Sequence, residues 1–596
     1  MKKWIAILTL AALVLTGCTQ QPTAPGTDEQ PGQEQGENVS AGIDVSTLFS
    51  DRDREGQFEE EKSAVITLSG TSASCSSNAV KIEGTTVTIT DEGTYILRGS
   101  LENGQIIVNA AKEDKTQLVL DGATVNSATS APIYILQADK VFITLAQGSN
   151  NTLSNGGSFE SADGNNIDGV IFSKEDITLN GSGSLTVTSP AGHGVVSKDE
   201  LTVTGGSYIV NCASHGFAGK DSVSIAAATL DITAGKDGIH GENSEDASLG
   251  YVYIQDGSFK IRAEGDGISA SAAMQIDGGS FDIVSGGGSK NAQQSTSDNW
   301  GGFMGGGMGK PGRPTQSTNT STTEDSTSMK GVKASGKLAI NGGSFTMDTA
   351  DDGVHSNADL TVTGGSFTIS TGDDGFHADE TLTVTAGTVN ITKSYEGLEG
   401  LHIKVSGGDI TLTASDDGLN AAGGTDESGF GGIRGDQFGG GMGRPGGMGG
   451  GMSSGNGSIV ISGGKLNITA SGDGIDANGT LEITGGYTVV CGPTQGDTAT
   501  LDYDKSAMIT GGTFIGTGAA GMAQSFSGAE QGVIALRTGN QSAGTKITVT
   551  DSKGNILIEH TPALDFAVVI LSAPDLKTGE RYTVSMGTLS KTLAAN

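Results

Sequence analysis

Asp351-Asp352-Gly353-Val354-His355-Ser356, followed by Leu360-Thr361-Val362-Thr363-Gly364-Gly365-Ser366-Phe367-Thr368-Ile369, is the stretch that decides the fold of this chain. The same pattern of a turn, short alternating runs and a Gly-Gly turn recurs along the sequence. The first glycines of its units are Gly169, Gly194, Gly216, Gly238, Gly267, Gly331, Gly353, Gly375, Gly397, Gly418 and Gly474. Those from Gly331 to Gly397 follow one another at intervals of 22 residues. A regular repeat of this kind predicts one structural unit per repeat.

Each unit holds three short segments of period 2, the spacing of strands with one buried face. Such a unit can bury its apolar side chains only by stacking on its neighbours. The pattern therefore predicts an all-β protein, a single-stranded right-handed parallel β-helix with about 22 residues per coil, over residues 63–517. Residues 518–596 lose the repeat but keep strand-like runs. Because an open helix end would expose strand edges, we expect them to form a small C-terminal β cap.

The alternation assigns side chains to the inside and the outside of the helix. The residue after the first glycine is apolar in all eleven units. The third residue after that glycine is small in all units but the first, which has Phe172. These two positions should point inward, and the residue between them should point outward. Phenylalanines follow the Gly-Gly turn on the inward parity and should form an internal aromatic stack: Phe259, Phe281, Phe345 and Phe367.

The composition excludes several classes of protein. The 596 residues include 97 Gly, with 34 Lys+Arg against 68 Asp+Glu, so the formal net charge is −34. A chain with this balance lacks the basic face that nucleic-acid binding requires, and we expect no nucleic-acid partner. Glycine does not occur at every third position, which excludes collagen.

The N-terminus is typical of a secreted lipoprotein. Lys2 and Lys3 precede an apolar run that ends in Leu15-Thr16-Gly17-Cys18, which resembles the bacterial lipobox. We therefore interpret residues 1–18 as a lipoprotein signal peptide with lipidation at Cys18, and an ordinary signal peptide is the alternative. Residues 19–62 are rich in Gln, Glu, Pro and Gly and predict a disordered acidic linker. The predicted location is extracellular, at the cell surface, anchored to the bacterial membrane by lipid only.

The repeat is interrupted by two insertions, and the chain has three cysteines besides Cys18. Residues 286–330 and 423–457 are rich in Gly and Met and predict mobile loops, with ligand contacts through Trp300 and Phe303 as the alternative. The remaining cysteines have no CxxC spacing, so we expect buried single thiols, with one disulfide as the alternative. They are Cys75, Cys212 and Cys491.

An acidic column is the main chemical feature of the repeat. The residue before the first glycine is acidic in most units, and in three units a second Asp precedes it. Carboxylates stacked about 4.8 Å apart repel one another by about 1 kcal/mol per pair in water. Since Lys and Arg are scarce, we expect a bound cation, and oxygen donors of this kind suit Ca²⁺. Turn formation by Asp and Gly is the alternative explanation. The candidate metal ligands are Asp351, Asp352, Asp373, Asp374, Asp416, Asp417, Asp237, Asp266 and Asp473, and the spacing places Asp168 in the same column.

The outward position two residues after the first glycine is polar in many units. The candidate ligand-binding residues at this position are His240, His355, His377 and Asn420, and Glu399 and Asp476 share it. His355 and His377 lie in adjacent coils and could form a transition-metal site. We favour the interpretation that they are surface hydrogen-bonding groups.

These features together resemble the clostridial carbohydrate-binding β-helix family. The resemblance rests on the Asp-Asp-Gly units, the Gly/Met-rich insertions, the lipobox and the C-terminal segment Phe566-Ala567-Val568-Val569-Ile570, Pro574-Asp575-Leu576 and Gly579. It implies a β-helix similar to polysaccharide lyases, bound calcium, and binding of cellulose and pectin-type polysaccharide. The calcium sites would carry over to the aspartates before Gly353, Gly375 and Gly418. The units of Gly331, preceded by Met329-Lys330, and of Gly397, preceded by Tyr395-Glu396, depart from the pattern.

The sequence therefore predicts a monomeric, non-catalytic, calcium-dependent polysaccharide-binding protein. A polysaccharide lyase is the first alternative, with Lys236, Arg262 or Lys393 as its base. A glycoside hydrolase using Asp373 and Asp374 is a related possibility. The same acidic unit recurs in coil after coil, whereas an active site should occur once, and this favours binding. A structural adhesin or spacer is the third hypothesis.

Overall fold

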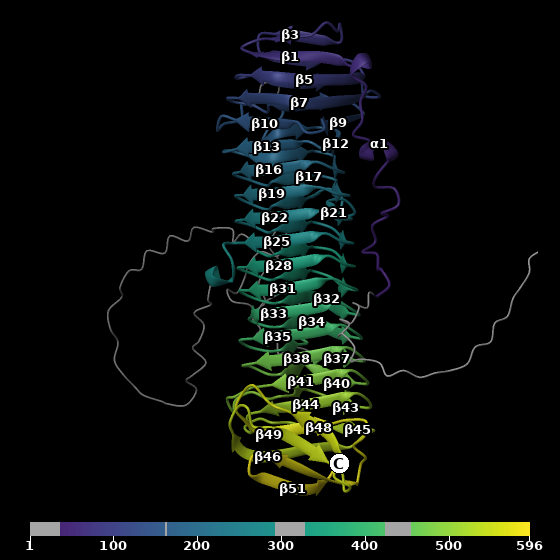
Figure 1. Ribbon diagram of the computed structural model, residues 1–596, viewed down its shortest axis with the longest axis vertical. Helices are drawn as coiled ribbons and strands as arrows, with labels where there is room; N and C mark the ends of the chain where they lie inside the picture. The colour runs from purple at the N-terminus through teal and green to yellow at the C-terminus, as the bar shows by residue number, and fades with distance from the viewer. Residues whose placement is uncertain (1–35, 161–163, 293–327, 423–454) are drawn as a thin grey trace, which may run out of the picture. The chain divides into compact units, whose positions relative to one another are not determined.

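The computed structural model describes residues 36–160, 164–292, 328–422 and 455–596. Cys18, Trp300, Phe303 and most of both insertions lie outside these residues. The described residues form one compact unit. Its strands stack in chain order, coil upon coil, as the colour gradient in Figure 1 shows. The predicted parallel β-helix is confirmed.

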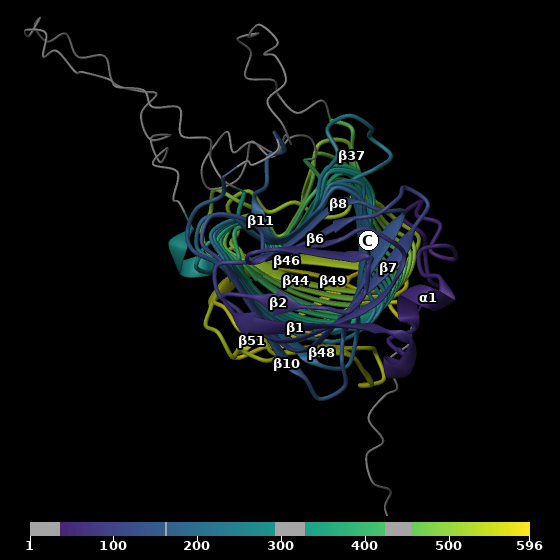
Figure 2. The same ribbon diagram turned by 90° about the horizontal axis from the view of Figure 1, so that it is seen from above.

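Each coil has three strands, and the coils superpose closely when seen from above (Figure 2). In the units from Gly194 to Gly474 the strands of the first face begin at or beside the first glycine, and further strands extend this face at both ends. The strands of this face are β4 (Thr86–Ile89), β6 (Gln105–Asn109), β8 (Ile133–Gln137), β11 (Gly169–Ser173), β14 (His193–Ser197), β17 (Phe217–Gly219), β20 (Ile239–Gly241), β23 (Ile268–Ala270), β26 (Val332–Ala334), β29 (Val354–Ser356), β32 (Phe376–Val384), β34 (Leu398–Val405), β36 (Leu419–Asn420), β39 (Ile475–Ala477) and β42 (Asp502–Tyr503).

The second face lies between the two turns of each unit, and β32 and β34 continue into it. Its strands are β9 (Lys140–Leu145), β12 (Asp176–Gly181), β15 (Glu200–Val203), β18 (Ser222–Ile225), β21 (Tyr251–Ile254), β24 (Met274–Ile276), β27 (Leu338–Ile340), β30 (Leu360–Val362), β37 (Gly457–Ile461), β40 (Gly479–Ile483), β43 (Ser506–Ile509) and β45 (Gly528–Ala529).

The third face follows the Gly-Gly turn. Its strands are β10 (Asn150–Asn155), β13 (Ser184–Ser189), β16 (Ser207–Cys212), β19 (Thr229–Ala234), β22 (Ser258–Ala263), β25 (Ser280–Ser285), β28 (Ser344–Thr349), β31 (Ser366–Thr371), β33 (Thr388–Ser394), β35 (Asp409–Ala414), β38 (Lys465–Ala470), β41 (Tyr487–Cys491) and β44 (Thr513–Gly518). At the N-terminal end, β1 (Ala64–Gly70), β2 (Ala73–Ser74), β3 (Val80–Glu83), β5 (Gly93–Leu101) and β7 (Lys115–Ser127) form the first coils.

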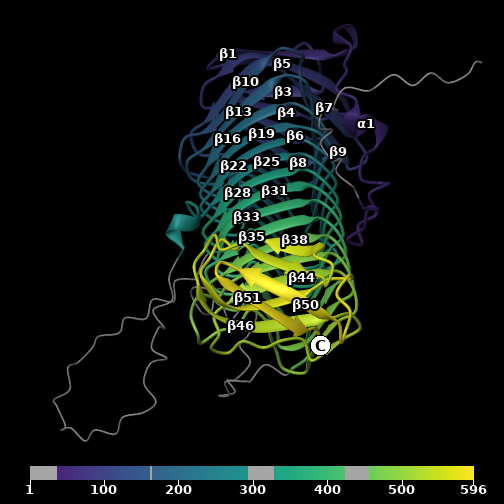
Figure 3. The same ribbon diagram turned by 60° about the horizontal axis from the view of Figure 1, so that its bottom comes forward.

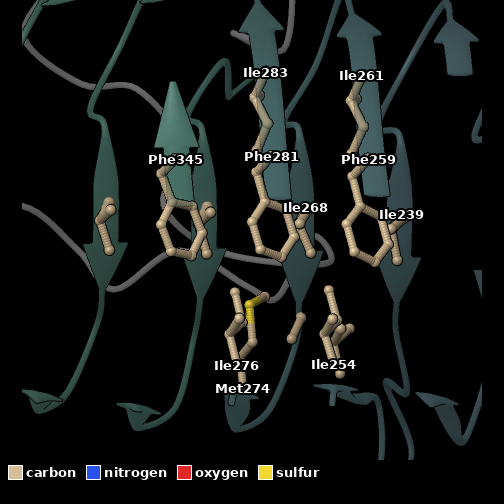
Figure 4. Packing of buried hydrophobic residues seen from close by; sticks show 14 of the residues in the cluster. Ile239, Ile254, Phe259, Ile261, Ile268, Met274, Ile276, Phe281, Ile283 and Phe345 are labelled. Carbon is tan, nitrogen blue, oxygen red and sulfur yellow. The ribbon is translucent and has the colours of Figure 1, made fainter. Parts of the chain in front are cut away.

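The interior is held by ladders of identical or similar side chains. Phe259, Phe281, Phe345 and Phe367 are in register, and successive rings stack with centroids 4.6, 4.5 and 4.7 Å apart. Figure 4 shows three of these rings above an isoleucine ladder. The turn before each Phe needs glycine because Gly365 has a φ of +97°, a conformation that other residues rarely adopt. The predicted aromatic stack is confirmed.

The pairing of β11 with β14 shifts the repeat unit assigned to Gly169 by one residue. Ile171, not Val170, pairs with Val195 and so occupies the position after the first glycine. Phe172 then lies at the outward position, where it packs in a small cluster with Val196, and Ser173 takes the small inward position. The apparent exception at Phe172 therefore disappears. Gly169 aligns with His193, so Asp168 lies one residue before the position of the acidic column, and the prediction that it belongs to this column is wrong.

Residues 36–62 are ordered, so the prediction of a disordered linker is wrong for this segment. It lies along the second face and contains α1 (Asp51–Arg54) and η1 (Glu60–Lys62), as Figure 1 shows. Asp53 is buried there, with Lys140 Nζ at 2.9 Å and the Thr178 hydroxyl donating to it at 2.5 Å. Burial alone would raise the pKa of Asp53, but these partners and Ser50 lower it. Specific polar contacts thus hold a segment whose composition is typical of a solvated tether.

The C-terminal segment covers the last coil, as predicted (Figure 3). Strand β49 (Phe566–Ser572) pairs antiparallel with β44 and with β46 (Val533–Gln541). Strands β47 (Ile547–Thr550), β48 (Ile556–His560), β50 (Arg581–Met586) and β51 (Leu589–Ala594) form a second sheet with an apolar cluster of its own. Within the described residues Cys75, Cys212 and Cys491 are free thiols, as predicted, but only Cys491 is buried, and Cys75 and Cys212 are partly exposed. The first insertion begins with η2 (Ser289–Asn291).

Candidate functional site

Two columns of polar side chains flank the first glycines. We call the residues before these glycines the turn column and the second residues after them the strand column. Backbone hydrogen bonds and strand register align the members from coil to coil. The turn column contains His193, His215, Asp237, Asp266, Lys330, Asp352, Asp374, Glu396, Asp417 and Asp473. The strand column contains His240, Ser269, Lys333, His355, His377, Glu399, Asn420 and Asp476.

The strand column is buried from His240 to Asn420, so the expectation that these side chains are exposed is wrong. His355 and His377 are 0% exposed, and His240 and Asn420 are also buried. They point away from the apolar interior, but the turn column folds over them. Asp352 Oδ2 lies 2.8 Å from His355 Nδ1, and Asp374 Oδ2 lies 3.2 Å from His377 Nδ1. A sequence pattern of inside and outside positions does not show that a turn covers the outside.

At the N-terminal end of the columns, two histidines contact the carboxylate of Asp237. Asp237 Oδ2 lies 3.3 Å from His215 Nδ1 and 2.8 Å from His240 Nδ1. Burial alone would raise the pKa of Asp237, but these histidines hold it well below its usual range. In the next coil, the Asp266 carboxylate accepts hydrogen bonds from Ser328 Oγ and the Lys330 amide. Both proposed metal ligands, Asp237 and Asp266, thus have protein partners.

In the middle of the columns a lysine takes the place expected for a metal ion. Lys330 is 1% exposed, and its Nζ lies 2.8 Å from Asp352 Oδ2 and 3.2 Å from Asp351 Oδ1. Asp373 completes a buried group whose carboxylate oxygens lie within 4.8 Å of one another. Burial alone would raise the pKa of Asp352, but Lys330 and His355 hold it well below its usual range. Lys330 stands before Gly331 where most units have an acidic residue, and this departure from the repeat is the sequence feature that could have predicted an internal counter-ion.

The next coils carry an excess of acid around one histidine. Glu399 Oε2 lies 2.7 Å from His377 Nδ1, and Asn420 donates to Glu396 Oε2 at 2.8 Å. Burial and the neighbouring acids Glu399 and Asp373 hold the pKa of Asp374 well above its usual range. Burial, with Glu399 and Asp417, does the same for Glu396. Local negative charge is therefore only partly balanced here.

At the C-terminal end, Asp417, Asp473 and Asp476 form a half-buried acidic group. Their carboxylate oxygens lie within 4.8 Å of one another, and among the described residues none of the three has an ion pair. The Asp473 amide donates to Asp417 Oδ1 at 2.5 Å. A Cβ on Gly472 would lie 2.3 Å from Asp416 Oδ1 and 2.4 Å from Asp417 Oδ1, so glycine makes room for both carboxylates.

These three acids have raised pKa values. Burial, followed by the charges of neighbouring aspartates, raises the pKa of Asp417 to about 8, of Asp476 to about 7 and of Asp473, which also accepts a backbone hydrogen bond, to about 6. An oxygen-only donor set that is partly open to solvent fits Ca²⁺, which takes six to eight oxygens at about 2.3–2.6 Å. The residues present therefore fit the cation that the sequence predicts.

Calcium should stabilise the protein more at pH 8 than at pH 5. Raised folded-state pKa values mean that the folded chain binds more protons than the unfolded chain between about pH 4 and pH 8, so charging these acids costs stability as pH rises. At pH 5 calcium must displace the protons bound to these aspartates, whereas at pH 8 a larger fraction of their carboxyl groups is already ionised. At one fixed calcium concentration, about 100 times the Kd at pH 8, calcium should add about 2.7 kcal/mol to the free energy of unfolding at pH 8 and much less at pH 5. Thermal unfolding with and without calcium at both pH values measures this increment, and an equal increment would contradict the assignment.

The basic residues considered for a lyase are mostly engaged elsewhere. Arg262 lies 2.8 Å from Asp282, and Lys393 Nζ donates to the Ser289 carbonyl at 2.8 Å. Both residues lie on the third face, in β22 and β33, whereas the acidic columns flank the first. Asp373 and Asp374, considered for a hydrolase, are buried. Within the described residues no helix is long and apolar enough to cross a membrane.

Part of the chain is similar to proteins described as carbohydrate-binding domain-containing. Residues 83–375 match the model of a family described as carbohydrate-binding domain-containing protein. A protein of that description from Acetivibrio thermocellus is 39% identical over 140 residues, which are 22% of this chain and 49% of the relative. The chain thus spans about half the length of this curated relative. It is also similar to a solved polysaccharide lyase-like protein from C. thermocellum, with 36% identity over 38% of this chain and 92% of that one and a TM-score of 0.37.

Proposed function

We propose that this protein is a cell-surface, calcium-dependent polysaccharide-binding protein without catalytic activity, for cellulose or polygalacturonate-type glycans. Lipidation at Cys18 would hold it to the outside of the bacterial membrane. The observation that carries the proposal is the half-buried group of Asp417, Asp473 and Asp476, whose members have no ion pair among the described residues. The carbohydrate-binding family match over residues 83–375 supports the class of ligand.

The acidic group gives this binding a physical mechanism. Asp417, Asp473 and Asp476 would hold Ca²⁺ on one side, with Asp416 beside them. Because the group is only half buried, the remaining coordination positions would face solvent and accept a uronate carboxylate. The bound cation supplies the positive charge between two acidic surfaces. A chain with a net charge of −34 would otherwise repel an acidic polymer.

The surroundings of the acids support binding rather than cleavage. General acid and base groups must reach the glycosidic bond and have different pKa values. Asp373 and Asp374 are 5% and 1% exposed, and a polymer cannot reach them in this structure. Arg262 and Lys393 already have partners, so neither is placed as a ready base.

Depletion from solution over a panel of insoluble polysaccharides tests the proposal. In calcium-containing buffer, cellulose or polygalacturonate should remove the protein from the supernatant, and an unrelated acidic protein should stay in solution. Incubation should yield neither new reducing ends nor unsaturated uronate products. Depletion by none of the polymers would favour the adhesin hypothesis, and either product would show that the protein is an enzyme.

A further inference from the structure

A second group of donor atoms lies beside the buried columns, at the ends of β29 and β32. His355 and His377 are in register in these strands, and Asn357 and Asp379 follow them by two residues. His355, His377 and Asp379 each place a possible ligand atom within 4.8 Å of the other two. The two imidazole rings stack with centroids 4.6 Å apart. The repeat thus brings two nitrogens and a carboxylate together across adjacent coils.

One of these nitrogens is buried without a hydrogen bond. His355 is 0% exposed, and its Nε2 has no hydrogen-bond partner among the described residues. The neighbouring Asn357 Oδ1 is also buried without such a partner, while Asn357 Nδ2 donates to Asp379 Oδ2 at 3.4 Å. A buried polar atom left unsatisfied costs about 1–3 kcal/mol. Two buried acceptors, two residues apart in the chain, thus lack a hydrogen-bond partner among the described residues, and this favours a ligand here.

The opposite edges of both rings are fixed by carboxylates. His355 Nδ1 lies 2.8 Å from Asp352 Oδ2, and His377 Nδ1 lies 2.7 Å from Glu399 Oε2. A proton on Nδ1 that donates to a carboxylate leaves the Nε2 lone pair available to a metal. This carboxylate–histidine pairing orients metal-binding histidines and makes their nitrogens more basic. His377 Nε2 is hydrogen-bonded to Asp379 Oδ1 at 3.1 Å, so zinc would displace the Nε2 proton; this spacing is close to the roughly 3.3 Å between donors in a tetrahedral zinc site.

We propose that His355, His377 and Asp379 bind Zn²⁺, with Asn357 Oδ1 or water as the fourth ligand. Nitrogen donors distinguish this site from the all-oxygen group around Asp417, because imidazole suits zinc and oxygen suits calcium. The Asp379 side chain is 17% exposed, which gives a cation access from solvent. The site is independent of the polysaccharide-binding proposal.

Equilibrium dialysis of the full chain against Zn²⁺ tests this site, after metal removal and in the presence of excess Ca²⁺. The wild type should retain zinc, and Asp379→Asn should weaken its affinity by at least about 10-fold, the loss seen when even an indirect partner of a metal ligand is removed. His355→Gln should do the same. Asp359→Asn is the matched control, because Asp359 is paired with Lys337 2.9 Å away and lies outside the group.

A spectroscopic readout separates metal binding from folding. Co²⁺ in place of zinc should give the visible bands of a tetrahedral site in the wild type and in Asp359→Asn, and these bands should be lost in Asp379→Asn. Asp379 is partly exposed, so this variant should keep the circular dichroism spectrum of the wild type. No zinc retained by the wild type would overturn the proposal. Equal zinc affinity in the wild type, Asp379→Asn and His355→Gln would also overturn it, since the metal would then be bound elsewhere, as at the stacked His193, His215 and His240.

Discussion

Replacing Lys330 by Met should lower the free energy of unfolding by about 3–5 kcal/mol, the cost of leaving a buried charge without its partner. Lys330 is 1% exposed and lies within 3.2 Å of both Asp351 and Asp352. Methionine fills a similar volume, so the loss measures the charge rather than a cavity. Urea unfolding followed by circular dichroism gives the difference.

Lys337→Met is the matched control for this experiment. Lys337 is also paired with an aspartate, Asp359 at 2.9 Å, but its side chain is 63% exposed. An exposed ion pair contributes about 1 kcal/mol or less, so the control should change stability little. Calcium should recover part of the loss in Lys330→Met, because Asp351, Asp352 and Asp373 would then offer their oxygens to a cation. Equal losses in the two variants would show that Lys330 does not neutralise the column.

The double variant Asp417→Asn/Asp473→Asn should bind calcium at least about 100-fold more weakly than the wild type. Truncating one partner of a buried charge interaction costs about 2–5 kcal/mol, and about 2.8 kcal/mol is a factor of 100 in affinity. Calcium titration by isothermal calorimetry measures this difference. Binding to polygalacturonate should fall in parallel, because the same two carboxylates would hold the bridging cation.

Stability without calcium distinguishes this result from misfolding. The raised pKa values of Asp417 and Asp473 show that charging them is unfavourable in the folded chain. Neutral asparagines remove that cost, so the double variant should be more stable than the wild type at pH 8 in the absence of calcium. Asp231→Asn/Asp409→Asn is the control, since these exposed aspartates pair with Lys260 and Lys465 on the third face. A double variant that is less stable than the wild type under these conditions would contradict the assignment.

The sequence predicted the fold well because the repeat is local and periodic. The spacing of the first glycines and the parity of Phe259, Phe281, Phe345 and Phe367 both follow from one coil stacking on the next. The one-residue shift at Phe172 escaped detection because Gly169 mimics the first glycine of a unit, and only strand pairing separates the two registers.

The candidate site was predicted less well because burial depends on neighbouring coils. Spacing placed Asp351, Asp352 and Asp373 together, and it placed Asp417 near Asp473. It did not show that the turns cover His355 and His377. It also did not show that Lys330 reaches into the next coil. The ordered segment 36–62 was missed for a similar reason, since its contacts join Asp53 to Lys140 and Thr178, far away in the sequence.

The calcium dependence of polygalacturonate binding tests the proposed function most directly. The full chain is mixed with insoluble polygalacturonate in calcium, then in EDTA, and then with calcium restored, and the protein left in solution is measured. We predict depletion of the protein in calcium, its release in EDTA and depletion again when calcium returns. A neutral glucan would be held by direct contacts, so EDTA should not release the protein from it. Binding to polygalacturonate that EDTA leaves unchanged would contradict a bridging cation.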